Sequence, residues 1–530
     1  MSLVNKLNVN LFSIIFIFLF ALLTNQYFGN RGVFPIDSFS HYDTGFRVLN
    51  GEFPFKDYWT VSGPFVDFIQ AFIFSIFGDS WQAYLLNGSL VNAIFAVLSY
   101  KLITKLGLEI KFALFYSLCI AVLAYPVSST PFVDLHSTYF SIFAIYFYLF
   151  ALITKKNIYW FFLPVLVFCS FLSKQVPAAY IFLGILLILI YNFANKDFKK
   201  NLTIFKILIF SSLTCIVVFF LILNLCQIRF EDFIHQYIGF PREIGGDRYF
   251  SLDYDFKNLV LDFKLIHLIF FAYASLIFYQ LKNKRKFKTS TNFIVFLFAL
   301  FILISLIQHQ LLTKNQIYIF FLIPLFASFA HIEIKNLFKN KKNYLKYTLI
   351  GICLISAFKY NERFNIERKF HELNYVKFSD SIDSKEIDAK LAGLRWITPD
   401  KVSKDSVKKE IKSINDILNI LRKNVDNNLV ITNYSFFSVI LKESQNGISR
   451  WYPENNSNFP RSTSKYFNIY KNFFISNIIR KEIKNIYVLF DVSETNVTKY
   501  IPAKCLTKEL SNNLFVKFKV EDKCLQFINF

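Results

Sequence analysis

An acidic, polar stretch at residues 35–65 directly follows an apolar segment and precedes a long series of further apolar segments. Its carboxylates include Asp37, Asp43 and Asp57, and Asp37 comes soon after the apolar segment ends. A carboxylate this close to hydrocarbon is costly unless it is used. Such a residue can serve as a general base between a lipid-borne and a water-borne reactant. The alternative, for any one of these acids, is an ordinary solvated position in a loop.

The elements that would position these residues are membrane helices. Hydrophobic residues make up 54% of the 530 residues, whereas soluble domains average roughly 45–50%. The excess lies in nearly uncharged blocks of about 18–24 residues, the length that crosses a bilayer as a helix. The blocks lack the two-residue alternation of barrel strands. The sequence therefore predicts a polytopic α-helical membrane protein.

About eleven transmembrane helices of this length are predicted. They are expected at residues 11–28, 81–104, 112–125, 135–153, 158–172, 177–193, 207–228, 261–281, 293–307, 317–332 and 344–358. Lys and Arg concentrate in alternate links, which indicates the cytoplasmic side. This alternation predicts a plasma (inner) membrane protein with a cytoplasmic N-terminus and the 35–65 stretch outside. Residues 66–77 are too short to span comfortably and are expected at the membrane interface.

The composition becomes polar from about residue 359. Residues 403–423 predict an amphipathic helix with Ser403 as its cap, and 428–434 and 485–492 predict buried strands. We therefore expect a membrane domain at 1–358 and an extracytoplasmic α/β domain at 359–530. Cys505 and Cys524 lie in this polar part; the prediction is a disulfide in an oxidising compartment, with two free thiols as the alternative.

Charge and cysteine usage exclude other classes of protein. The net charge of +22 comes from basic links between apolar blocks, so it reflects membrane topology rather than a nucleic-acid surface. No two cysteines stand in a CxxC pair, which disfavours a zinc or redox site.

The order of residues in the first loop carries a family resemblance. Asp37 stands fourteen positions before Gly51; FPFKDYW follows, then SGPF. This run resembles the first outer loop of the polyprenyl-phosphate-dependent glycosyltransferases of the GT-C superfamily, which includes protein O-mannosyltransferases and aminoarabinose transferases. STPFVDLHSTYF contains Asp134, SFLSKQVPAAY contains Lys174, and TKNQIYIFFLIPLF begins near Lys314; all three resemble family segments. The resemblance covers about residues 10–335.

The resemblance implies transfer of a sugar from a polyprenyl-phosphate donor, at a membrane lipid surface, to an extracytoplasmic glycan, lipid or protein of the cell envelope. It implies Asp37 as the base and Asp134 as its assistant, with inversion by a single displacement. The residues expected to bind substrate, chiefly the donor phosphate, are Lys174, Arg242, Arg248, Lys314, Asp57 and Asp43. Members of the family commonly have Asp-Glu where this chain has Asp37–Ser38. No cofactor is therefore certain, and a divalent metal is not supported.

Several of these assignments have plain alternatives. Arg242 and Arg248 flank two glycines in a segment that is typical of a flexible, solvated loop. Lys314 can simply extend its ammonium group to the membrane–water interface. Residues 451–456, WYPENN, are a weaker candidate for contact with an acceptor glycan. For the whole chain, the alternatives are a transporter or flippase of lipid-linked sugars and a non-catalytic envelope assembly protein.

Overall fold

The computed structural model describes residues 3–194, 198–283, 285–314, 319–338, 343–424, 426–453, 457–521 and 524. The chain forms two compact units, each built from segments that are far apart in the sequence. Unit 1 contains Met1–Gly29, Leu85–Phe219 and Arg248–Phe370. Unit 2 contains Asn30–Tyr84, Phe220–Asp247 and His371–Phe530.

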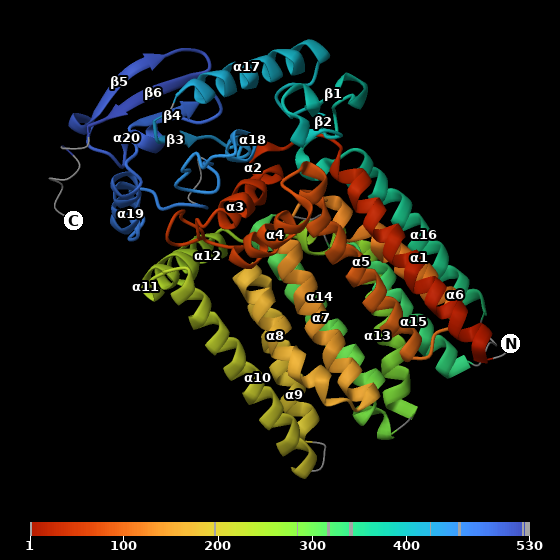
Figure 1. The fold of residues 1–530 in the computed structure, drawn as a ribbon. Coiled ribbons are helices and arrows are strands. Elements are labelled where there is room, and N and C mark those ends of the chain that lie inside the picture. Colours follow the sequence, from red (N-terminus) through yellow and green to blue (C-terminus); the bar gives the residue numbers. More distant parts are fainter. Residues whose placement is uncertain are drawn as a thin grey trace. The chain divides into compact units, whose positions relative to one another are not determined.

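Unit 1 is built from long apolar helices (Figure 1). These are α1 (Leu3–Gly29), α5 (Trp81–Lys105), α6 (Ile110–Leu123), α7 (Val133–Thr154), α8 (Asn157–Ser173), α9 (Gln175–Ala194), α10 (Phe198–Leu225), α13 (Lys264–Asn283), α14 (Thr291–Thr313), α15 (Leu322–Phe338) and α16 (Asn343–Tyr360). Helix α7 packs on α8 and α9, and α13 packs on α15. Aromatic and aliphatic side chains, among them Phe95, Tyr139 and Leu306, form its buried core.

The prediction of a polytopic α-helical membrane protein is confirmed. Within the described residues, eight helices are long and apolar enough to cross a membrane. They correspond to eight of the predicted spans, so the count of eleven is not confirmed. Helices α8 and α15 have 17 residues each, and α16 has lysines near both ends, Lys346 and Lys359. Residues 317–318 of the predicted tenth span lie outside the described residues.

Unit 2 combines helices with a two-stranded sheet, β1-β2, and a four-stranded sheet. Its elements are α2 (Pro35–Ser38), α3 (Ser40–Leu49), α4 (Pro64–Phe77), α11 (Phe230–Phe233), most of α12 (Phe240–Phe250), β1 (Ile382–Asp383), β2 (Arg395–Trp396), α17 (Lys404–Lys423), β3 (Asn428–Ile431), α18 (Phe437–Leu441), α19 (Phe467–Arg480), β4 (Asn485–Leu489), α20 (Thr495–Thr498), β5 (Leu506–Ser511) and β6 (Phe515–Val520). The four-stranded sheet has the order β3-β4-β6-β5, in which only β3 and β4 are parallel.

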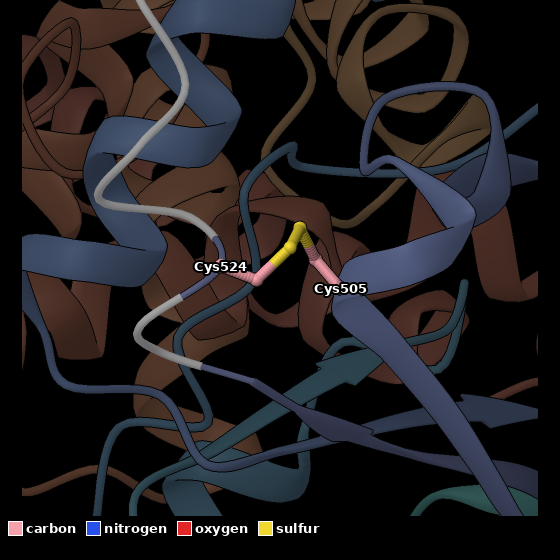
Figure 2. The surroundings of a disulfide bond; sticks show 2 residues. All are labelled: Cys505 and Cys524. Carbon is pink, nitrogen blue, oxygen red and sulfur yellow. A yellow bond between two sulfur atoms is a disulfide. The ribbon is translucent and has the colours of Figure 1, made fainter.

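Local predictions for the polar part of the chain are confirmed. Ser403 caps α17, and its hydroxyl accepts a hydrogen bond from the Ser406 backbone N–H. Strands β3 and β4 are buried along their whole length, as continuous apolar runs predict. Cys505 and Cys524 form a disulfide (Figure 2).

Residues of the first loop belong to the core of unit 2. The backbone N–H of Trp59 donates to the backbone carbonyl of Ile448 at 2.7 Å. The buried Trp59 indole packs against Tyr470 and Phe240. Residues 30–84 therefore form one compact unit with residues 371–530. The predicted division of the chain at residue 358 stays a prediction.

One acid of unit 2 predicts a pH dependence of stability. Asp491 follows β4 and accepts hydrogen bonds from the Thr432 hydroxyl at 2.8 Å and the Asn433 N–H at 2.6 Å. Burial raises the pKa of Asp491 to about 6 despite these bonds. Because the pKa of Asp491 is higher in the folded than in the unfolded chain, the protonated carboxyl group stabilises the fold. This stabilisation is complete below about pH 4 and is lost as the pH rises through about 6.

We therefore expect Asp491→Asn to raise the unfolding temperature, relative to the wild type, more at pH 7.5 than at pH 4.5. The asparagine cannot ionise, so the variant avoids the cost of a buried charge. Thermal unfolding of the detergent-solubilised chain at the two pH values measures the difference. An equal offset at both pH values would contradict the assignment.

Candidate functional site

Asp37 lies in α2, which begins at Pro35 after an extended segment. The N–H groups of Gly32 and Val33 donate to the carbonyls of Arg395 and Ile397 at 3.0 and 2.9 Å. This pairing anchors the approach to α2 within unit 2. The Asp37 side chain is partly buried.

Ser38 occupies the position where the resembling family commonly has a second acid. Its hydroxyl accepts a hydrogen bond from the Phe34 N–H at 3.0 Å, and the residue is almost fully buried. Ser38 thus closes the first turn of α2 in place of presenting a carboxylate. Among the described residues, no cluster of three or more His, Cys, Asp or Glu side chains could hold a metal ion.

Asp43 and Asp57 both belong to a network of charges in unit 2. The Arg47 guanidinium donates to Glu52 Oε2 at 2.6 Å and to Gly447 O at 2.7 Å, and lies 3.7 Å from Asp43 Oδ2. Asp57 pairs with Arg480 at 2.8 Å and accepts the Phe53 N–H at 2.7 Å. Both oxygens of Asp57 are therefore engaged by protein groups.

Glu52 is the electrostatic centre of this network. Burial alone would raise its pKa, but Arg47 and Lys481 together lower the pKa of Glu52 to about 2. Lys481 Nζ lies 2.7 Å from Glu52 Oε1. The carboxylate therefore stays ionised and holds Arg47 in place at neutral pH.

A second buried network surrounds Asp67, which is fully buried on α4. Its oxygens accept hydrogen bonds from Thr44 Oγ1 at 2.5 Å and Tyr58 OH at 2.9 Å. Arg450 Nη2 lies 2.6 Å from Oδ2, and His41 Nδ1 lies 2.7 Å from Oδ1. Burial opposes ionisation, but Arg450 and His41 lower the pKa of Asp67 below its usual value.

Asp134 and Lys174, two of the predicted site residues, are in contact in unit 1. Lys174 Nζ lies 2.8 Å from each oxygen of Asp134. Asp134 lies in the first turn of α7 and is buried, while the Lys174 side chain, between α8 and α9, is 22% exposed. The buried carboxylate thus holds an ammonium that can still reach a ligand.

His309 completes this cluster. Its Nε2 lies 3.1 Å from Asp134 Oδ1 and 2.9 Å from Val176 O. Since both neighbours are acceptors, Nε2 carries the proton. The signal for His309 in the sequence is weak: a single polar residue near the end of an apolar helix. Asp134 therefore accepts three hydrogen bonds from Lys174 and His309.

The remaining predicted cations are more exposed. Arg242 and Arg248 lie on α12, Arg242 exposed and Arg248 partly buried. Their segment, expected to be a flexible loop, is helical through Gly245 and Gly246. Lys314 is exposed at the C-terminal end of α14. Arg242 belongs to unit 2, whereas Arg248 and Lys314 belong to unit 1. In the 451–456 segment, residues 454–456 lie outside the described residues.

Comparison with known proteins bears on this site. Residues 61–223 match the model of the family described as dolichyl-phosphate-mannose-protein mannosyltransferase. The match includes Asp134 and Lys174, and over this range it confirms the predicted resemblance to glycosyltransferases. No curated protein matches the chain. Among solved structures, the crystal structure of ArnT from Cupriavidus metallidurans in the apo state is similar, with 12% sequence identity and a TM-score of 0.44, covering 95% of this chain and 97% of that chain.

Proposed function

We propose that the chain is an integral-membrane glycosyltransferase that moves a sugar from a polyprenyl-phosphate donor to an extracytoplasmic glycan, lipid or protein. The observation that carries the proposal is the Lys174–Asp134 pair, because it lies in the range that matches the mannosyltransferase family. The family's description names a lipid phosphate as the sugar carrier, and a held ammonium is a suitable phosphate ligand. The protein would lie in the plasma membrane with a cytoplasmic N-terminus. Residues 1–358 would form the catalytic membrane domain and residues 359–530 an extracytoplasmic domain.

The proposed reaction is a single displacement. The acceptor hydroxyl gives its proton to the Asp37 carboxylate as its oxygen attacks the anomeric carbon of the sugar. The bond between that carbon and the phosphate oxygen breaks, and its electron pair leaves with the lipid phosphate. The configuration at the anomeric carbon is therefore inverted.

The cations would stabilise the charge that develops on the leaving phosphate. Lys174 is the leading candidate, with Arg242, Arg248 and Lys314 as further ones. Asp134 is a positioning residue in this scheme, because both of its carboxylate oxygens are in contact with Lys174 and one of them also with His309. Both oxygens of Asp57 are engaged by Arg480 and the Phe53 N–H. Asp57 would therefore support substrate binding indirectly, by holding the backbone of the first loop in place.

The test of function uses the purified chain in proteoliposomes with a panel of polyprenyl-phosphate-linked monosaccharides. Transfer predicts release of free polyprenyl phosphate from at least one donor, detected by mass spectrometry. A transporter would move the intact donor across the bilayer without releasing polyprenyl phosphate. An assembly protein would do neither, and either result would reject the proposal.

We expect Lys174→Gln to lower kcat/KM for the donor by about 10- to 100-fold, because one charge-assisted hydrogen bond is worth about 1.5–3 kcal/mol. Lys174→Arg keeps the charge and should retain more activity. Lys111→Gln is the matched control, since Lys111 is an exposed lysine in the first turn of α6. Donor kinetics that do not change in Lys174→Gln would remove this residue from the phosphate site.

A further inference from the structure

A small polar cavity of about 20 Å³ lies within unit 2. Asp43 of α3 faces it, together with Ser438 of α18. Thr432 and Gln445 come from the segments that flank α18, and Ser449 and Tyr452 from the segment that continues toward α19. Helix α18 packs directly on α3, so the cavity lies between the first loop and the C-terminal part of the unit.

Three hydroxyl groups that line the cavity, those of Thr432, Tyr434 and Ser435, donate their protons to protein acceptors. Thr432 Oγ1 donates to Asp491 at 2.8 Å, and Ser435 Oγ donates to Arg450 O at 3.1 Å. Ser449 Oγ and Tyr470 OH share a hydrogen bond of 2.9 Å. What the three donating hydroxyls still offer is lone pairs. A ligand group that contacts them must therefore donate hydrogen bonds.

Gln445 supplies the strongest evidence for such a ligand. The residue is 6% exposed, and its Nε2 donates to Glu443 O at 3.2 Å. Its Oε1 is buried without a hydrogen-bond partner among the described residues. Buried amide oxygens are nearly always satisfied by protein, water or ligand. In a cavity that also contains a carboxylate, this oxygen indicates a place for a donor group.

The charges around the cavity favour a neutral donor over a cation. Asp43 and Glu52 carry two negative charges, and Arg47 and Lys481 carry two positive ones in contact with them. Burial raises the pKa of Asp43, although Arg47 and a hydrogen bond from Ser438 oppose the rise. An ammonium would disturb this balance, whereas a hydroxyl group would not. The volume admits a hydroxyl-bearing edge of a molecule, not a whole sugar ring.

We propose that this cavity binds a hydroxyl-bearing edge of the acceptor glycan, with Gln445 Oε1 and the Asp43 carboxylate accepting hydrogen bonds from its hydroxyl groups. The proposal deepens the proposed function and rests on it. Asp37, the base that would act on the acceptor hydroxyl, lies in the helix directly before Asp43. Tyr452, from the 451–456 segment, also lines the cavity. Among the acceptors considered above, a carbohydrate presents the largest number of hydroxyl donors.

The experiment measures binding without catalysis. Saturation-transfer NMR on the full chain in detergent uses the methyl α- and β-glycosides of glucose, galactose and mannose, and methyl 2-amino-2-deoxyglucoside, as probes. At least one neutral glycoside is expected to bind. Gln445→Leu and Asp43→Asn should each weaken this binding by about fivefold or more, as loss of one hydrogen bond predicts. Asp400→Asn, at an exposed acid in the same unit, should leave it unchanged.

Asp43→Asn keeps the side-chain shape, so it tests the proposal even where Gln445→Leu fails to fold. Three results would overturn it: no saturation transfer to any neutral glycoside, equal binding by wild type and both variants, or preferred binding of the amino glycoside. An experimental density map at high probe concentration that shows an ordered water only would also overturn it. If the chain binds a neutral glycoside but shows no transferase activity, the proposed function is rejected and the carbohydrate site is retained.

Discussion

Replacement of Asp37 by Asn is expected to slow sugar transfer by about 10²- to 10⁴-fold, the usual contribution of a general base. The amide has nearly the shape of the carboxylate but cannot accept a proton from the acceptor hydroxyl. Asp37 is partly buried in α2, and the helix is held by backbone pairing of residues 32–33 with residues 395–397. The substitution should therefore leave the fold intact. Release of polyprenyl phosphate in proteoliposomes, at equal protein abundance, measures the effect.

Two controls make this prediction specific. Asp400→Asn changes an exposed acid of the same unit and should leave the transfer rate unchanged. Glycoside binding by Asp37→Asn should match the wild type, because a base acts on the transition state and is not needed to bind the acceptor. Full transfer by Asp37→Asn would eliminate Asp37 as the base and move the search to another carboxylate.

The membrane helices could be predicted because their signal is local. Apolar blocks of sufficient length, separated by basic links, mark α1, α5 and α7 without knowledge of the fold. The count was less secure, because α8 and α15 have 17 residues each and length alone does not decide whether they span. The cap at Ser403 and the two buried strands were also local patterns, and all three are confirmed.

The contacts of the candidate site were only partly visible in the sequence. Asp134 and Lys174 were each identified as candidates, but their ion pair joins residues 40 positions apart. His309 joins them from α14, and no spacing rule links it to Asp134. Arg450 and Asp67 are 383 positions apart. The available signal was Asp67 itself, an acid inside an apolar helix, which requires a buried partner whose identity only the fold reveals.

Arg450→Met is expected to produce the largest loss of stability among the substitutions considered, about 3–5 kcal/mol, because it leaves the Asp67 carboxylate buried without its cation. Arg450 is 2% exposed, and it also donates to Ser62 O at 2.8 Å. In the wild type, burial and Arg450 lower the pKa of His41, so Arg450 is the main positive partner of the Asp67 carboxylate. Thermal unfolding of the detergent-solubilised chain measures the loss.

The double variant separates lost charge from lost packing. Asp67→Asn combined with Arg450→Met removes both charges, so it should recover part of the stability that Arg450→Met loses; a buried pair replaced as a whole costs less than a pair that is broken. Arg422→Met is the matched control: its guanidinium is half exposed and 3.8 Å from Asp388, and exposed pairs contribute about 0–1 kcal/mol. If the double variant is no more stable than Arg450→Met, Arg450 stabilises the fold through packing. The Asp67 carboxylate then does not require the positive charge of Arg450.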